Sequence, residues 1–147
     1  MINYIETHLV DHCNLRCKGC SHFSGLAPKI YKDYDDFCQE MNVLASCAPV
    51  HTIRLMGGEP LLHPRAVDFC VATRKLFPTS EIVLVSNGIL LPTLTDEQIS
   101  ILNNNNIALC MSNYGLKLDW NQINKFKIHY FHNKNIMYNI SLDLSGS

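Results

Sequence analysis

The sequence predicts an α/β fold in which strands and helices alternate and the strands run parallel. Apolar strands begin near residues 52, 81, 107 and 128, and residues with a helical pattern separate each from the next. Alternating βα units imply parallel strands joined by right-handed crossovers. The polar motifs of the chain also follow strands, and parallel βα folds bind ligands beyond the carboxyl ends of their strands. We therefore expect these motifs to meet at one end of the sheet.

The first half of the chain predicts a strand, a helix and a second strand. Residues 4–10 alternate in polarity and are rich in strand-forming types, whereas 21–30 look irregular. Residues 33–48 carry apolar side chains at helical spacing, and Pro49 ends that helix. A short strand follows at 52–56.

The second half repeats this pattern. A helix is expected between Pro64 and Phe77, where Pro78 stops it. The later elements are a strand at 81–85, a helix that opens at Thr95 or Asp96, a strand at 107–111, a short helix at 119–126 and a strand at 129–131.

Length, charge and composition exclude several classes of protein. The 147 residues suit one domain spanning 1–147. Twelve basic and thirteen acidic residues leave no basic surface for nucleic acid or an anionic membrane. The start of the chain does not resemble a secretory signal, and no apolar run is long enough to span a bilayer. Seven cysteines, an odd number, do not form a disulfide pattern, so we expect a reducing cytoplasm.

Three cysteines near the start form the pattern CxxxCxxC: Cys13, Cys17 and Cys20. This spacing lets one loop place three thiolates around one corner of a [4Fe–4S] cluster, and the fourth iron then stays open to a small molecule. The alternative is a zinc site completed by His12 or His22, although no second ligand pair of the usual kind is present.

With two further motifs, the cysteine pattern resembles the radical S-adenosylmethionine (SAM) superfamily. These motifs are Gly57-Gly58-Glu59-Pro60 and Ser86-Asn87-Gly88, and the resemblance extends from Tyr4 to about Tyr114. It implies a partial (βα)6-type barrel, apparently truncated at its C-terminus in this chain. It also implies a [4Fe–4S] cluster and SAM, which is reductively cleaved to methionine and a 5′-deoxyadenosyl radical. That radical abstracts hydrogen from a substrate.

The resemblance also assigns roles to individual residues. Cys13, Cys17 and Cys20 would ligate iron, the GGEP segment would meet the methionine amino group, and the SNG segment would lie near the ribose or carboxylate of SAM. The implied SAM contacts are Gly57, Gly58, Glu59, Pro60, Ser86, Asn87, Gly88 and, at the equivalent position after the fourth strand, Ser112. The alternative for GGEP and SNG is a pair of ordinary turns.

One position departs from the family pattern. Many members have an aromatic residue directly before the third cysteine, where it packs near the SAM adenine, but this chain has Gly19. Phe23 and His22 are the candidates to take over that contact, and His22 is also a candidate to hydrogen-bond the cluster or substrate.

The other four cysteines are expected to fill the core as small apolar side chains. They are Cys38, Cys47, Cys70 and Cys110. Of these, Cys47 is the best remaining candidate for a metal ligand.

The sequence leaves the following functions open. The leading one is a radical SAM enzyme with an unidentified small-molecule or peptide substrate and a reductant such as flavodoxin or ferredoxin. The others are a non-catalytic binding module stabilised by zinc or an Fe–S cluster, and an inactive fragment of a radical SAM enzyme. A shortened member whose open side is covered by a partner is also consistent with the four or five strands expected here.

Overall fold

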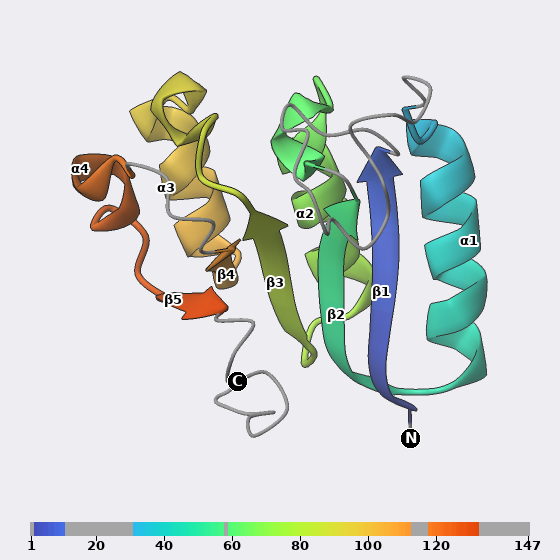
Figure 1. The fold of residues 1–147 in the computed structure, drawn as a ribbon. Helices are drawn as coiled ribbons and strands as arrows, with labels where there is room; N and C mark the ends of the chain where they lie inside the picture. Colours follow the sequence, from blue (N-terminus) through green and yellow to red (C-terminus); the bar gives the residue numbers. More distant parts are fainter. Residues whose placement is uncertain (1, 11–30, 58, 113–117, 133–147) are drawn as a thin grey trace.

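Five parallel strands form one sheet in the order β1-β2-β3-β4-β5. The computed structural model describes residues 2–10, 31–57, 59–112 and 118–132. The strands are β1 (Ile2–Val10), β2 (Val50–Gly57), β3 (Glu81–Ser86), β4 (Ile107–Ser112) and β5 (His129–His132). Neighbours in the sheet are thus also neighbours along the chain (Figure 1). The expected α/β class with parallel βα units is confirmed.

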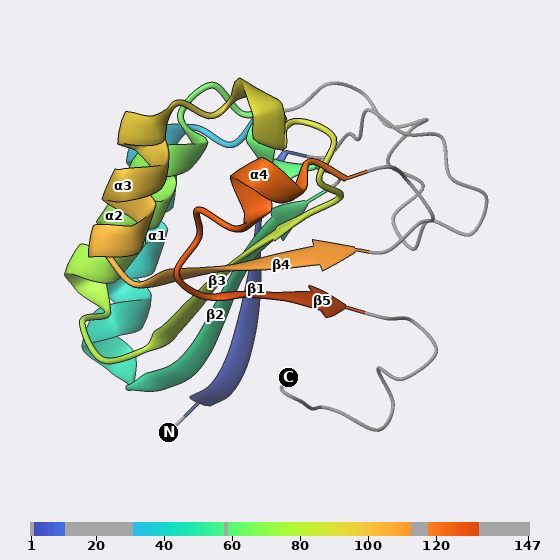
Figure 2. The ribbon, with the colours of Figure 1, turned by 90° about the vertical axis from the view of Figure 1, so that its left-hand side faces the viewer.

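Helices connect these strands and gather on one side of the sheet. They are α1 (Tyr34–Cys47), α2 (Ala66–Leu76), α3 (Asp96–Asn104) and the short α4 (Trp120–Ile123), with 3-10 turns η2 (Pro60–Leu62) and η3 (Leu91–Thr93). Figure 2 shows α1, α2 and α3 together on one side of the curved sheet. Sequential strand order with the connecting helices on one side is the arrangement of an open, partial βα barrel. Within the described residues, no helix has the length and apolar character needed to cross a bilayer.

Local sequence signals explain where the helices begin. The side chain of Asp33 accepts a hydrogen bond from the Asp36 backbone N–H at the start of α1. Thr95 and Gln98 form a reciprocal capping box at the start of α3, so Thr95 is the cap.

Two helices differ from the expected bounds. The helix expected from Pro64 begins at Ala66, because the backbone of Arg65, with φ of −114° and ψ of 27°, is not helical. The one expected over 119–126 is reduced to a single turn, Trp120–Ile123. The segments at 21–30 and 141–147 lie outside the described residues.

Side-chain alternation gives the sheet two different faces. The face toward the helices is apolar, and its side chains pack with Phe37 of α1 and Phe69 of α2 in the main core. They include Leu9, Ile53, Leu55, Ile82, Leu84, Ile107, Leu109 and Met111. We call the opposite side the inner face; it carries Tyr4, Glu6, His8, Thr52, Arg54, Met56, Val83, Val85, Ala108, Cys110 and Tyr130. A separate small cluster, centred on Val83, Ala108 and Cys110, covers part of it.

Candidate functional site

The carboxyl ends of β1, β2 and β3 lie side by side and bring the GGEP and SNG motifs together. Val10 at the end of β1 is in register with Gly57 at the end of β2, and β2 is paired in turn with β3. GGEP begins at the last residue of β2, and SNG begins at the last residue of β3. We call this end of the sheet the rim.

Both ends of the segment that holds the three cysteines are fixed at this rim. Val10, just before it, forms an antiparallel bridge with Tyr31, just after it. The Lys32 backbone N–H also donates to the Leu9 carbonyl oxygen at 2.8 Å. The segment therefore leaves the end of β1 and returns to the same place. Cys13, Cys17, Cys20, Gly19, His22 and Phe23 themselves lie outside the described residues.

His63 ties the returning chain to the start of α2. Its Nε2 lies 2.7 Å from the Lys32 carbonyl oxygen, and its Nδ1 accepts from the Arg65 backbone N–H at 2.9 Å. These partners fix the neutral tautomer with the proton on Nε2. The ring is only 6% exposed and contacts the Phe69 ring edge-on, with the centroids 4.5 Å apart.

Sequence reasoning did not identify this role of His63. The carbonyl that His63 contacts is 31 residues away in the sequence. No local pattern marks such a pair.

Glu59 joins the loop after β2 to the loop after β3. Its Oε1 accepts from the Asn87 backbone N–H at 2.7 Å. Its Oε2 accepts from the Ser86 hydroxyl at 2.9 Å and from the Leu61 backbone N–H at 3.0 Å. The side chain is 0% exposed. One carboxylate thus links the GGEP and SNG motifs, which are 27 residues apart.

Burial changes the acidity of this carboxylate. It raises the pKa of Glu59 to about 7, and the hydrogen bonds from Asn87, Leu61 and Ser86 oppose part of that increase. A buried carboxyl without a paired cation favours its neutral form. The charge at the centre of the rim therefore changes near neutral pH.

Ser86 and Asn87 build a tight turn at the end of β3. The Ser86 hydroxyl accepts from the Gly88 backbone N–H at 3.0 Å, and the Asn87 Oδ1 accepts from the Ile89 backbone N–H at 2.9 Å. Both residues are buried. Gly88 has φ of +88°, which favours glycine. The ordinary turn that the sequence analysis gave as the alternative for SNG is therefore present. Contact of Ser86, Asn87 and Gly88 with SAM stays a prediction.

Gly57 allows β2 to end directly against β1. Its φ is +138°, and a Cβ atom at this position would lie 2.2 Å from the Val10 carbonyl oxygen. Any side chain would collide with the backbone that leads into the cysteine segment. Gly58, its neighbour, lies outside the described residues.

The remaining expected contacts are Pro60 and Ser112. Pro60 is buried and opens η2 directly after Glu59. Ser112 is the last residue of β4 and is in register with His132 of β5. It is thus at the carboxyl end of its strand, as expected.

The described residues offer no alternative metal centre. Among them, no group of three or more His, Cys, Asp or Glu is placed to hold a metal ion. Cys70 and Cys110 are buried, and burial raises the pKa of their thiols to about 12 and about 11. Neutral thiols are poor ligands, so these two residues fill the core as expected.

The other two cysteines differ from each other. Cys38 is half-buried against the core, whereas Cys47 is exposed at the end of α1. The expectation that Cys47 fills the core was wrong, because the buried side of α1 is formed by Phe37 and Met41 and Cys47 lies on its exposed side. The three thiolates of the CxxxCxxC segment remain the donor set that suits an Fe–S cluster.

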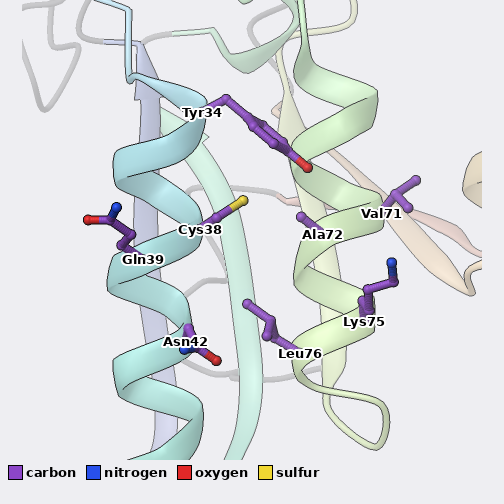
Figure 3. Close-up of a pocket in the computed structure, with 8 residues that line it drawn as sticks. All are labelled: Tyr34, Cys38, Gln39, Asn42, Val71, Ala72, Lys75 and Leu76. Carbon is purple, nitrogen blue, oxygen red and sulfur yellow. The ribbon is translucent and has the colours of Figure 1, made fainter.

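A groove on the outer surface is separate from the rim. It lies between α1 and α2 and has a volume of about 390 Å³. Figure 3 shows the residues that line it: Tyr34, Cys38, Gln39, Asn42, Val71, Ala72, Lys75 and Leu76. The groove belongs to the helical layer, on the other side of the sheet from the inner face.

Comparison with known proteins identifies relatives of this architecture. A family model described as a 4Fe-4S single cluster domain matches residues 5–137. GTP 3′,8-cyclase of Clostridium perfringens is 35% identical over 101 residues, which cover 61% of this chain. GTP 3′,8-cyclase of Heliobacterium modesticaldum is 29% identical over 99 residues, or 65% of this chain. The matched regions are only 28% and 30% of the lengths of those two relatives.

Two solved structures share the fold. BtrN in complex with AdoMet and 2-DOIA has a TM-score of 0.67 and 17% identity, covering 92% of this chain and 58% of that one. The structure of anSMEcpe with bound AdoMet and Cp18Cys peptide has a TM-score of 0.65 and 16% identity, covering 99% of this chain and 47% of that one. The likeness extends over nearly the whole of this chain.

Proposed function

Because the chain belongs to the 4Fe-4S single cluster domain family, within the radical SAM superfamily that its motifs resemble, we propose that it catalyses radical SAM chemistry. The observation that carries this proposal is the construction of the rim. Glu59 joins GGEP to SNG beside the point where the cysteine segment leaves and rejoins β1. Two motifs far apart in the sequence thereby lie beside both ends of the segment that carries the third.

The proposed cofactors are a [4Fe–4S] cluster held by Cys13, Cys17 and Cys20, and SAM. When bound, they supply one electron to break the bond between the SAM sulfur and C5′, giving methionine and a 5′-deoxyadenosyl radical that takes hydrogen from the substrate. Both solved structures contain bound AdoMet, which supports SAM here.

This chain's own residues would position SAM. Glycine has no side chain that would keep a ligand away from the backbone, and Gly57 and Gly58 would contact SAM through their backbone groups. Ser86, Asn87 and Gly88 would hold the opposite part of SAM, and Glu59 would keep the two loops at a fixed separation. Pro60 and Ser112 complete the proposed contacts.

We propose that the substrate binds on the inner face, below the rim. The relatives and solved structures are named for a nucleotide, a small molecule and a peptide, so the chemistry of their substrates differs widely. The electron would come from a reductant such as flavodoxin or ferredoxin. An oxygen-sensitive cluster suits the reducing cytoplasm as the site of action.

A paired substitution tests the proposal. Cys17→Ser should prevent assembly of the intact cluster after anaerobic reconstitution with iron and sulfide. It should also abolish formation of 5′-deoxyadenosine from SAM. Cys47→Ser is the matched control, since this thiol is exposed and lies outside the rim. It should keep both properties.

Retention of SAM cleavage in Cys17→Ser would contradict the assignment. Bound zinc without acid-labile sulfide in the unmodified protein would favour the metal-stabilised binding module instead.

A further inference from the structure

Lys32 marks the place where the cysteine segment returns to the rim, and its backbone is held on two sides. Its N–H donates to the Leu9 carbonyl oxygen at 2.8 Å, and its carbonyl oxygen accepts from Nε2 of His63 at 2.7 Å. Tyr31, directly before it, forms the bridge with Val10. The return of the segment is thus tied to β1 and, through His63, to the chain that follows GGEP.

The side chain of His63 is itself held in one orientation. Its Nδ1 accepts from the Arg65 backbone N–H at 2.9 Å, and its own backbone N–H donates to the Pro60 carbonyl oxygen at 3.0 Å. The ring lies edge-on to the rings of Phe69 and Tyr31, with centroids 4.5 Å and 5.7 Å away. A residue that is only 6% exposed and has both ring nitrogens bonded keeps its carbonyl partner in a fixed place.

The stretch 59–63 therefore holds a neighbouring part of the rim at each of its ends. Glu59, its first residue, accepts hydrogen bonds from the SNG turn, and His63, its last, donates to Lys32. Backbone hydrogen bonds close the 3-10 turn η2 between them. One short, internally bonded stretch thus sets how far the return of the cysteine segment lies from the SNG turn.

The two ring nitrogens of His63 serve different purposes. The partner of Nδ1 is two residues away in the sequence and lies at the start of α2, so this bond is a local one. The partner of Nε2 is 31 residues away, at the end of the segment that carries the three cysteines. Metal ligands are held in their productive geometry by hydrogen bonds from outside the ligand set. The Nε2 bond is of that kind.

We propose that Nε2 of His63 positions the cysteine segment so that the open iron of the cluster faces the SAM held by GGEP and SNG. It acts through the Lys32 carbonyl and is therefore a positioning residue. A displacement of about 1 Å is enough to weaken such an arrangement severely. This inference rests on the proposed function, because it assigns a further role at the same site.

Two substitutions separate the two bonds of the ring. In His63→Asn, the amide oxygen takes the place of Nδ1 and accepts from the Arg65 N–H, but the side chain is too short to reach the Lys32 carbonyl. In His63→Gln, the longer side chain places an N–H donor near the position of Nε2. The bond to Lys32 is then restored at the expense of the bond to Arg65.

Electron paramagnetic resonance of the reconstituted and reduced protein gives the SAM concentration that produces half of the spectral change. His63→Asn should raise this concentration by about tenfold or more, and His63→Gln should stay within about threefold of the unmodified protein. Denaturant titration of the cluster-free proteins should show similar losses of stability in both variants, since each loses one hydrogen bond. A merely structural role of His63 would instead lower SAM affinity equally in the two.

His129→Gln is the matched control. Nδ1 of His129 lies 2.9 Å from the Phe126 carbonyl oxygen at the amino end of β5, and the rim is at the opposite end of the sheet. The substitution removes a histidine–carbonyl bond of the same kind from another part of the fold. SAM should bind to this variant as it does to the unmodified protein.

Unchanged SAM binding in His63→Asn would overturn the inference, as would equal weakening in His63→Asn and His63→Gln. Failure of His63→Asn to fold, judged by far-UV circular dichroism, would overturn it too, because His63 would then chiefly stabilise the fold. Failure of the proposed function has a different signature. In that case the unmodified protein itself gives no [4Fe–4S]⁺ signal, or gives one that does not change with SAM.

Discussion

The two faces of the sheet are built from the same strands but differ in what they hold. The face toward the helices is a continuous apolar core in which Phe37, Phe69 and the aliphatic side chains of four strands are buried together. The inner face mixes Tyr4, Glu6 and Arg54 with a small apolar cluster. Successive residues of a strand point to opposite sides of the sheet. One residue therefore packs in the apolar core while its neighbour lies on the mixed inner face.

The face toward the helices mainly stabilises the fold, whereas the inner face and the rim are available for ligand binding. Side chains toward the helices have little freedom to vary, since each fills space in a close-packed interior. Those on the inner face and at the rim carry polar groups whose partners are backbone atoms, one another or, as proposed, a ligand. Three substitutions test this separation.

The largest effect is expected on the face toward the helices. Phe69→Ala removes a fully buried ring that contacts Phe37, Tyr34 and His63, and it should lower the free energy of unfolding by about 3–5 kcal/mol. Denaturant titration of the unmodified and substituted proteins measures it. Val43→Ala, on the exposed side of α1, is the control and should change stability by about 0.5 kcal/mol or less. Equal losses in both variants would contradict the placing of Phe69 in the main core.

A smaller loss of stability is expected where the end of β2 packs against the end of β1. Gly57→Ala places a Cβ atom against the Val10 carbonyl oxygen at a positive φ, and should cost about 2–4 kcal/mol through overpacking and backbone strain. The same change at Gly88 should cost less, since its Cβ would meet only the end of the flexible Leu118 side chain. Thermal unfolding of both variants makes the comparison. A better tolerated alanine at position 57 than at 88 would contradict the described rim.

The smallest of the three losses of stability is expected for substitution of Glu59, the carboxylate at the rim. Gln in place of Glu59 accepts from Asn87 through its oxygen, but its amide nitrogen cannot accept from Leu61. Glu59→Gln should therefore cost about 1–3 kcal/mol in acidic solution, where Glu59 is protonated. Glu97→Gln, on an exposed part of α3, is the control.

The pH dependence of this difference has a defined sign. Burial raises the pKa of Glu59 from its ordinary 4.5 to about 7 in the folded protein. Its stabilising contribution is complete below pH 4.5 and is lost as the pH rises through about 7. The stability advantage over Glu59→Gln should therefore shrink between about pH 5 and pH 8. An advantage that stays constant over this range would show that Glu59 is ionised throughout.

The sequence predicted the elements better than the contacts between them. Periodicity and caps located every described strand and helix, because these signals are local. The expected meeting of motifs at the strand ends also follows from parallel topology alone. By contrast, the contacts of Glu59 with Ser86 and of His63 with Lys32 depend on how the loops fold across neighbouring strands. Nothing local in the sequence sets these distances.

The sequence predicted which residues form the site but not the contacts that they make with one another. Ser86 and Asn87 were expected to contact SAM, yet the structure shows their side chains forming bonds within the rim. A hydroxyl or an amide oxygen serves a turn or a ligand equally well, so residue type alone does not distinguish the two.

Electron paramagnetic resonance of the anaerobically reconstituted and reduced protein, with and without SAM, tests the proposed function most directly. A [4Fe–4S]⁺ signal that changes when SAM is added is the expected result, since it reports an open iron that SAM reaches from the rim. A signal that does not change when SAM is added would contradict the proposal, as would bound zinc without a cluster.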